Sequence, residues 1–352
     1  MIQSNVILEI SKNNIIHNYN FFNELHKKNI CSATVKSNGY GLGAEKIYRL
    51  LLNNGCKHFF VATTEEGLSL RKNFSKGFIY ILNGTEFNNY KIFKKYNLIP
   101  ILSNLNDYRK MKNKSLNYGI QINTGINRLG MNYNEYEEIL FKDKNLKIIM
   151  SHLACADNKQ NPYNSLQLNK FKQIKDHDGN NKIVFSLANS FGSVLSKEYL
   201  FDMIRPGISI YGGHFNNIIL KKHIKSVVKL KAKILQIKLL DKNQFVGYNQ
   251  TYKTKKKTWI AVVGIGYGDG LNRILSNNGM VYLKNTKYNI IGRISMDSII
   301  VDITKGISNF KNETYVDIIN YKHGIDELAK NCKTISHEIL TSLTNRVERK
   351  FV

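Results

Sequence analysis

The sequence predicts an α/β protein, with an N-terminal (β/α)8 TIM-type barrel followed by a mainly-β C-terminal domain. Three observations lead to this fold class. The chain has 352 residues, more than one small core requires. Eight strand-like runs follow residue 30, and most of them lead into a helical pattern or a turn. After about residue 225 the pattern changes to strand upon strand.

The eight barrel strands are expected in runs rich in β-branched and aromatic residues. These runs are CSATV, HFFVA, FIYIL, LIPIL, YGIQI, LKIIMS, KIVFSL and FDMI. Helices are expected between them at residues 43–54, 64–73, 86–96, 133–142 and 164–176. We therefore assign the barrel to residues 8–224.

A β-rich domain is expected at residues 225–352, together with a strand at residues 1–7. Its strand candidates are SVVKLKAKILQIKLL, TWIAVVGIG, MVYL, NIIGRI and SIIVDI. The first run of the chain, NVILEI, precedes a helical pattern at 12–28 and has no place among the eight barrel strands. We expect it to pair with the β-rich domain.

The composition argues against a membrane protein, a disulfide-rich protein and a metal-binding protein. No run of about 18 apolar residues occurs, and the first residues, MIQSNVILEISKNN, lack a basic region followed by an apolar stretch. A cytoplasmic protein without a membrane partner is expected. The four cysteines are scattered and form no CxxC pair, so neither a disulfide framework nor a metal site is indicated.

The net charge of +26 raises the possibility of a nucleic-acid partner. However, the lysines are dispersed along the chain, and no RNA- or DNA-binding motif accompanies them. Heavy use of Lys, Asn and Ile throughout is typical of a codon bias across a proteome. No nucleic-acid partner is expected.

The stretch SATVKSNGYGLGAEKI allows two interpretations. Read as G-x-G-x-x-A, it is a dinucleotide-binding loop of Gly39, Gly41 and Ala44, with Glu65 or Glu66 as the ribose-binding acid. A Rossmann strand should lead almost directly into the first glycine, whereas residues 36–38 intervene here. The stretch is better explained as the first βα loop of a barrel, with Lys36 at the end of strand one.

Polar residues recur where the predicted strands end, which is where barrel enzymes keep their chemistry. They are Lys36 after strand one, Asn123 and Arg128 after strand five, His152 after strand six, residues 188–190 after strand seven and Arg205 after strand eight. The last two loops suit a phosphate. A lysine, an arginine and a phosphate site together suggest pyridoxal phosphate (PLP), bound to Lys36 as a Schiff base.

Seven motifs in register closely resemble the alanine racemase family. They are ATVKSNGYGLG, NTGINRLGM, SHLACADN, ANSFGSVL, MIRPGISIYG, VGIGYGDG and GRISMDSIIVDIT. The resemblance implies an isomerase that interconverts L- and D-alanine through a PLP aldimine by a two-base proton transfer, supplying D-alanine for peptidoglycan. It also implies a homodimer with an active site shared across the interface.

By this resemblance, Lys36 carries PLP and is the base on the D-face of the substrate. Tyr267, supplied by the second subunit, is the opposite base. A tyrosine with an ordinary pKa of about 10 needs tuning to act as a base, and in the family a hydrogen-bond chain through His152 to Arg205 provides it. Arg205 at the pyridine nitrogen would disfavour transamination; alternatively, it could simply pair with a carboxylate.

Other binding residues follow from the same resemblance. The implied phosphate contacts are Tyr40, Asn189, Ser190, Gly207 and Ile208. Arg128 is placed at the cofactor's phenolic oxygen and at the substrate carboxylate, and the backbone N–H of Met296 at that same carboxylate.

The chain also departs from the family pattern. Gln121 occupies a position where many members carry a carboxylated lysine that orients the arginine. The C-terminal tail has Asn345 near the place of a phosphate-contacting tyrosine, and Ser295 replaces a frequent cysteine. Two alternatives stay open: a racemase of broader specificity, for example toward serine, and a PLP-binding barrel without racemase activity. The second would lack the β-rich domain.

Overall fold

The computed structural model describes residues 4–25, 27–84, 90–139, 141–178, 182–215 and 217–352. The chain forms two compact units. The barrel unit comprises Ile16–Ile210 and His214–Ile224, and the β unit comprises the N-terminal residues through Ile15, Tyr211–Gly213 and Lys225–Val352. Within the described part of the chain, every helix is too short or too polar to cross a bilayer.

Parallel strands at eight positions form the wall of the barrel unit. In chain order they are β2 Ile30–Cys31 continued by β3 Ala33–Thr34, β4 His58–Val61, β5 Phe78–Ile81, β6 Leu98–Leu102, β7 Tyr118–Asn123, β9 Leu146–Met150, β10 Val184–Ser186 and β11 Met203–Ile204. The first seven positions form one continuous sheet, in which each of the first six pairs in parallel with the next. The short strand β8 Met131–Asn132 adds to the edge of β7.

The wall closes because β11 pairs in parallel with β2, placing Met203 opposite Ile30. Between β10 and β11, the backbone N–H of Asp202 donates to the carbonyl of Phe185 at 3.0 Å. The predicted barrel is therefore confirmed. The open sheet that a dinucleotide-binding interpretation requires is not formed.

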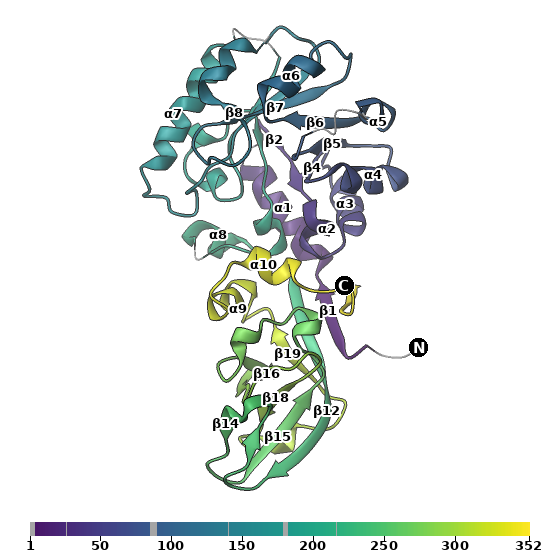
Figure 1. The fold of residues 1–352 in the computed structure, drawn as a ribbon, viewed down its shortest axis with the longest axis vertical. Coiled ribbons are helices and arrows are strands. Elements are labelled where there is room, and N and C mark those ends of the chain that lie inside the picture. Colours follow the sequence, from purple (N-terminus) through teal and green to yellow (C-terminus); the bar gives the residue numbers. More distant parts are fainter. Residues whose placement is uncertain (1–3, 26, 85–89, 140, 179–181, 216) are drawn as a thin grey trace. The chain divides into compact units, whose positions relative to one another are not determined.

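Helices cover the outside of these strands, as Figure 1 shows for α3 to α7. The helices of this part are α1 Lys12–Leu25, the short α2 Lys36–Tyr40, α3 Ala44–Asn53, α4 Thr64–Asn73, α5 Tyr90–Lys95, α6 Leu105–Met111, α7 Tyr163–Asp176 and α8 Ile218–His223. The start of the helix predicted at 86–96, residues 86–89, lies outside the described residues.

The prediction of an α-helix at residues 133–142 is wrong. The chain forms only a 3-10 helix there, η2 Tyr133–Glu138. None of the side chains of this 3-10 helix is buried. An α-helix of this length needs an apolar face packed on the core, whereas residues 133–138 have no buried side chain and the buried Ile139 and Phe141 follow the 3-10 helix.

The barrel interior is filled by large apolar side chains from successive strands. One cluster contains Phe60, Tyr80, Ile99, Ile101, Ile148, Met150 and Met203. The rings of Phe60 and Tyr80 stack with centroids 4.5 Å apart. The barrel interior is thus a packed core and not an open channel.

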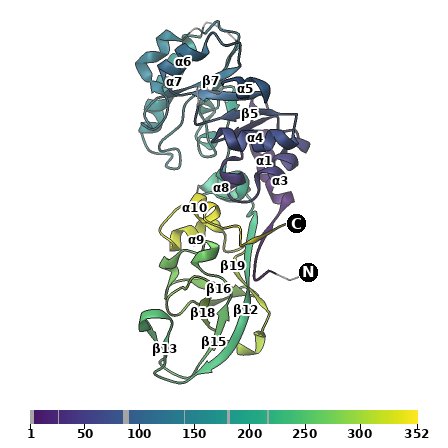
Figure 2. The same ribbon diagram turned by 45° about the vertical axis from the view of Figure 1, so that its right-hand side comes forward.

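The β unit is built around one long strand, β12 Val228–Leu240, which Figure 2 shows running along the unit. The other elements are β1 Val6–Ile10, β13 Phe245–Val246, β14 Tyr252–Lys253, β15 Thr258–Val263, β16 Met280–Leu283, β17 Thr286–Asn289, β18 Ile299–Asp302, β19 Tyr315–Ile319, β20 Glu348–Phe351, α9 Ile325–Asn331 and α10 Ser336–Thr341. β12 pairs with β1, β15 and β19, all antiparallel.

Two expectations about this unit have opposite outcomes. The first strand of the chain does pair with the β-rich part, since β1 lies between β12 and β20. The run NIIGRI does not form a strand of its own: Asn289 is the last residue of β17, and Ile290 makes an isolated bridge to Val301. Gly292 adopts φ of +75°, a left-handed conformation that interrupts extended backbone at this point.

Candidate active site

Lys36 begins an unusual turn directly after strand β3. Residues 37 to 40 all have left-handed backbone angles, with φ of 53° at Ser37, 53° at Asn38, 62° at Gly39 and 55° at Tyr40. Left-handed backbone costs about 1–2 kcal/mol for each residue other than glycine. Local hydrogen bonds offset this strain, among them the N–H of Gly39 to the carbonyl of Val35 at 2.8 Å.

Glu66 holds this turn against the end of the second barrel strand. One carboxylate oxygen accepts from the backbone N–H of Ser37 at 2.6 Å, and the other accepts from Ala62 at 2.7 Å. The same carboxylate completes a capping box with Thr63 at the start of α4. Glu66 is therefore a support of the Lys36 turn, and the ribose-binding role considered for it is wrong.

The Lys36 amine is only partly exposed, and its environment disfavours the protonated form. Burial lowers the pKa of Lys36, and the positive charge of Arg128 lowers it further. The carboxylate of Glu66 acts in the opposite direction and raises it. A lysine of lowered pKa has a larger neutral fraction at pH 7, which is the form that attacks carbonyl carbons and accepts protons.

Tyr40, Ser190 and Gly207 meet although they come from the loops after strands one, seven and eight. A Cβ added at Gly207 would lie 2.3 Å from the Tyr40 hydroxyl oxygen, so only glycine permits this approach. The backbone N–H of Gly207 donates to the Ser190 hydroxyl at 2.9 Å. Burial raises the pKa of Tyr40, which keeps its hydroxyl protonated and able to donate.

Two further predicted contacts lie beside this group. Ile208 begins the 3-10 helix η5 Ile208–Tyr211, and its backbone N–H donates to no acceptor among the described residues. The side-chain oxygen of Asn189 instead accepts from the N–H groups of Phe191 and Gly192, at 3.1 and 2.9 Å. Asn189 therefore shapes the loop after strand seven with its oxygen.

Arg205 is a buried cation, 5% exposed, at the end of strand β11. Its guanidinium donates to the carbonyl of Ser151 at 2.6 Å and to the hydroxyl of Ser186. Burial lowers the pKa of Arg205 to about 9, so it is still charged at neutral pH. No carboxylate of the described residues forms an ion pair with it, so the simple pairing considered from the sequence is not observed.

His152 directly follows Ser151, whose backbone carbonyl accepts the hydrogen bond from Arg205. This hydrogen bond therefore also fixes the end of strand β9, where His152 lies. The carbonyl of His152 accepts from Gln167 at 3.0 Å, and Gln167 also donates to the hydroxyl of Thr124 at 3.1 Å. A buried polar network therefore links the ends of strands β7, β9 and β11.

Arg128 is exposed on the loop between β7 and β8. Buried Gln121, 4% exposed, donates to the backbone carbonyl of Leu129 at 2.7 Å. At the base of the loop, the side-chain oxygen of Asn123 accepts from the N–H of Asn127 at 3.0 Å. Gln121 therefore holds the backbone next to Arg128, and among the described residues no group hydrogen-bonds the guanidinium itself.

Tyr267 and Met296 lie together in the β unit. Tyr267 starts the 3-10 helix η7 Tyr267–Asp269, and its N–H donates to the carbonyl of Ser295 at 3.1 Å. The N–H of Gly268 donates to the carbonyl of Met296 at 2.9 Å. Both side chains are exposed, Tyr267 by 43% and Met296 by 52%. Among the described residues, none accepts from the Met296 N–H.

Sequence reasoning did not find Glu66 as a support, nor Ser151 and Ser186 as partners of Arg205. The sequence gives a weak indication of the two serines, because each is a small polar residue at the end of an otherwise apolar strand run. The contact between Glu66 and Ser37 had no signal, since it joins the turn after β3 to the start of α4, which the parallel pairing of β3 with β4 brings together.

Comparison with known proteins identifies both units. A family model described as alanine racemase, N-terminal domain, matches residues 10–214. A second one, alanine racemase, C-terminal domain, matches residues 227–351.

Curated relatives and solved structures agree with these matches. An alanine racemase of Rickettsia canadensis is 39% identical, with 98% of each chain covered. One of Rickettsia bellii is 41% identical over 92% of this chain and 82% of its own. The crystal structure of an alanine racemase from Bartonella henselae, described as having covalently bound pyridoxal phosphate, superimposes with a TM-score of 0.93, at 34% identity over 99% of this chain and all of its own (100%).

The charge of Arg128 is expected to hold the Lys36 amine in its more reactive, neutral form. In protein freed of bound small molecules, Arg128→Ala should move the reaction of Lys36 with an amine-acetylating reagent to higher pH, because a cation that disfavours protonation is removed. Peptide mass spectrometry after short pulses across a pH series measures this profile. Arg109→Ala, which breaks an exposed ion pair with Glu138 on another part of the barrel, is the control. An unchanged Lys36 profile in Arg128→Ala would contradict the electrostatic coupling.

Proposed function

Because this chain belongs to the alanine racemase family, we propose that it interconverts L-alanine and D-alanine with PLP by a two-base proton transfer. The observation that carries the proposal is the meeting of the Lys36 turn, Arg205 and the Tyr40–Gly207 contact at one rim of the barrel. The D-alanine formed would supply peptidoglycan synthesis, and the enzyme would act in the cytoplasm.

The residues at the rim fit PLP. The lowered pKa of Lys36 favours the neutral amine that condenses with the aldehyde. The Tyr40 and Ser190 hydroxyls and the Ile208 N–H, which has no acceptor among the described residues, form a donor set for a phosphate, close to the small residue Gly207. Asn189 lies beside them. Arg205 supplies a buried positive charge that no described carboxylate neutralises, and it would hold the pyridine nitrogen.

When bound, PLP would delocalise the negative charge that develops at the substrate α-carbon when its proton leaves. Racemisation then needs a proton removed from one face and one delivered to the other. Lys36 would exchange the proton on the D-face and Tyr267 the proton on the L-face. In this proposal His152 and Arg205 tune Tyr267, and the carbonyl of Ser151 fixes Arg205.

The substrate carboxylate would be bound by Arg128 and by the backbone N–H of Met296. Two features support this assignment: the Arg128 guanidinium is not hydrogen-bonded by a described group, and the Met296 N–H has no described acceptor. Gln121 would keep Arg128 in place through the loop backbone, using a neutral amide.

The functional unit would be a homodimer. Lys36 belongs to the barrel unit and Tyr267 to the β unit. We propose that the β unit of one subunit supplies Tyr267 and Met296 to the barrel of the other, so that each dimer has two shared sites.

Lys36→Ala should abolish both cofactor attachment and activity. The purified wild-type protein with added PLP is expected to convert L-alanine to D-alanine, measured by coupling to a D-amino-acid oxidase. Its visible absorbance should show the band of a lysine-bound PLP imine, and borohydride should trap PLP on the Lys36 peptide. An unchanged trapped adduct in Lys36→Ala would disprove the assignment, and a wild-type protein that leaves L-alanine unchanged would disprove the function.

Tyr267→Phe should separate the two half-reactions. Exchange of the α-proton with deuterium, followed by NMR for each enantiomer in heavy water, should be lost for L-alanine and retained in part for D-alanine. Removal of a general base typically costs about 10²- to 10⁴-fold. Equal losses for both enantiomers would mean that Tyr267 supports the site and is not one of its bases.

Mixed dimers test the shared site. Lys36→Ala and Tyr267→Phe subunits, each inactive alone, should recover about one quarter of wild-type activity after dissociation and random reassembly, because half of the dimers are mixed and each has one intact site of two. Reassembly of two differently tagged Lys36→Ala subunits is the control. Mixed dimers that are isolated by both tags and stay inactive would rule out interface catalysis.

A further inference from the structure

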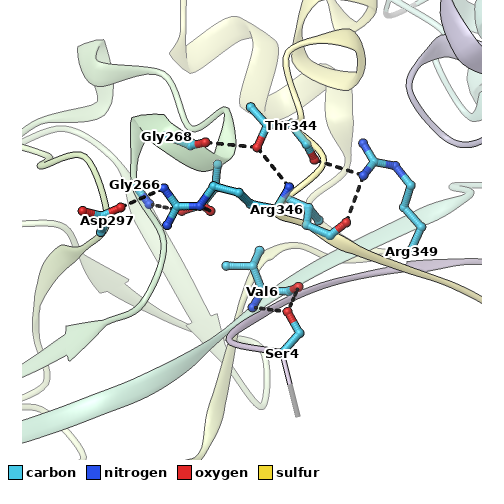
Figure 3. A network of polar contacts seen from close by, with 10 residues as sticks. Ser4, Val6, Gly266, Gly268, Asp297, Thr344, Arg346 and Arg349 are labelled. Carbon is cyan, nitrogen blue, oxygen red and sulfur yellow. Dashed lines mark hydrogen bonds and ion pairs between the residues drawn. The ribbon is translucent and has the colours of Figure 1, made fainter. Parts of the chain in front are cut away.

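Arg346, in the C-terminal segment, joins the two loops that carry Tyr267 and Met296. Its Nε atom lies 3.1 Å from a carboxylate oxygen of Asp269, two residues after Tyr267. Its Nη1 atom lies 2.8 Å from a carboxylate oxygen of Asp297, the residue after Met296. Figure 3 shows the guanidinium between these loops. One side chain therefore bridges two loops that are distant from it in sequence.

Asp269 closes the turn around Tyr267 from within. It is 2% exposed, and its second carboxylate oxygen accepts from the N–H of Gly266 at 2.9 Å. Its two oxygens thus link the residue before Tyr267 to Arg346. Because a buried carboxylate that loses its cation is strongly destabilised, the turn is expected to rearrange when Arg346 is removed.

The backbone of the C-terminal segment fits the same turn. The hydroxyl of Thr344 donates to the carbonyl of Gly268 at 3.0 Å, and its N–H donates to the carbonyl of Asp269 at 3.2 Å. A Cβ added at Gly268 would lie 2.6 Å from Nη1 of Arg346. The guanidinium is therefore packed against the turn at the residue that follows Tyr267.

We propose that Arg346 is a positioning residue for the L-face base: it fixes the Tyr267 turn against the Met296 loop, and this inference rests on the proposed racemase function. Exposed ion pairs usually contribute little to a structure. Arg346 differs from these because one partner is buried and because the cation connects two loops.

The test compares α-proton exchange from L-alanine and from D-alanine in heavy water, using the PLP-loaded full-length enzyme. Arg346→Gln should lower the ratio of the L-alanine rate to the D-alanine rate by at least about tenfold, since a misplacement of about 1 Å can cost about 100-fold. A general loss of folded or PLP-loaded enzyme lowers both rates together and leaves the ratio unchanged. Arg346→Lys, which can reach only one carboxylate at a time, should give an intermediate ratio.

Lys350→Gln is the matched control. It removes a cation from the same C-terminal segment, but one whose partner, Glu348, is exposed and belongs to the same strand. Its exchange ratio should equal that of the wild type. If Arg346→Gln fails to fold, Asp297→Asn provides the second test, because Asp297 is exposed and its loss removes only one arm of the bridge.

Two results would overturn the proposal. One is an equal loss, or no loss, of exchange for both enantiomers in folded Arg346→Gln or Asp297→Asn. The other is a wild-type ratio in Arg346→Lys. Either result, obtained beside an active wild-type enzyme, would leave the proposed racemase function standing, whereas an inactive wild-type enzyme would refute that function first.

Discussion

The parallel pairing of β2 with β11 is the constraint on which the candidate site depends. It places Ile204 opposite Cys31, so the residues after both strands leave the barrel at the same rim. The contact continues beyond the strands, where the N–H of Thr34 donates to the carbonyl of Pro206 at 3.0 Å. Lys36 and Arg205 are 169 residues apart in sequence, and this closure brings their strand ends side by side.

Positive charge without matching carboxylates characterises this rim. Buried Arg205 is held by a carbonyl and a hydroxyl, and Arg128 lowers the pKa of Lys36. Among the residues that the structure describes, Glu66 is the carboxylate that acts on Lys36, and both of its oxygens accept backbone N–H groups. Burial and mutual repulsion disfavour the charged forms of these basic side chains as long as no anion is bound. The arrangement therefore attracts an anionic ligand, whose charge would compensate theirs.

Glycines set close approaches next to the candidate site residues in each of the two units. In the barrel unit, Gly207 lets the Tyr40 hydroxyl reach the loop after strand eight. In the β unit, a Cβ at Gly266 would lie 2.2 Å from the carbonyl oxygen of Met296, so glycine is required where the Tyr267 turn meets the neighbouring loop. Any larger residue would push apart the groups that the site brings together.

The sequence by itself determined the barrel, the β-rich unit and the polar strand ends, because strand alternation and residue type are local properties. It did not determine the left-handed turn at residues 37–40, whose strain is offset both by local hydrogen bonds and by the distant carboxylate of Glu66. It also left open whether Arg205 pairs with a carboxylate, and how Gln121 supports its loop. Tertiary structure decided these points, since burial and hydrogen-bond partners depend on which strand ends the closed barrel places side by side.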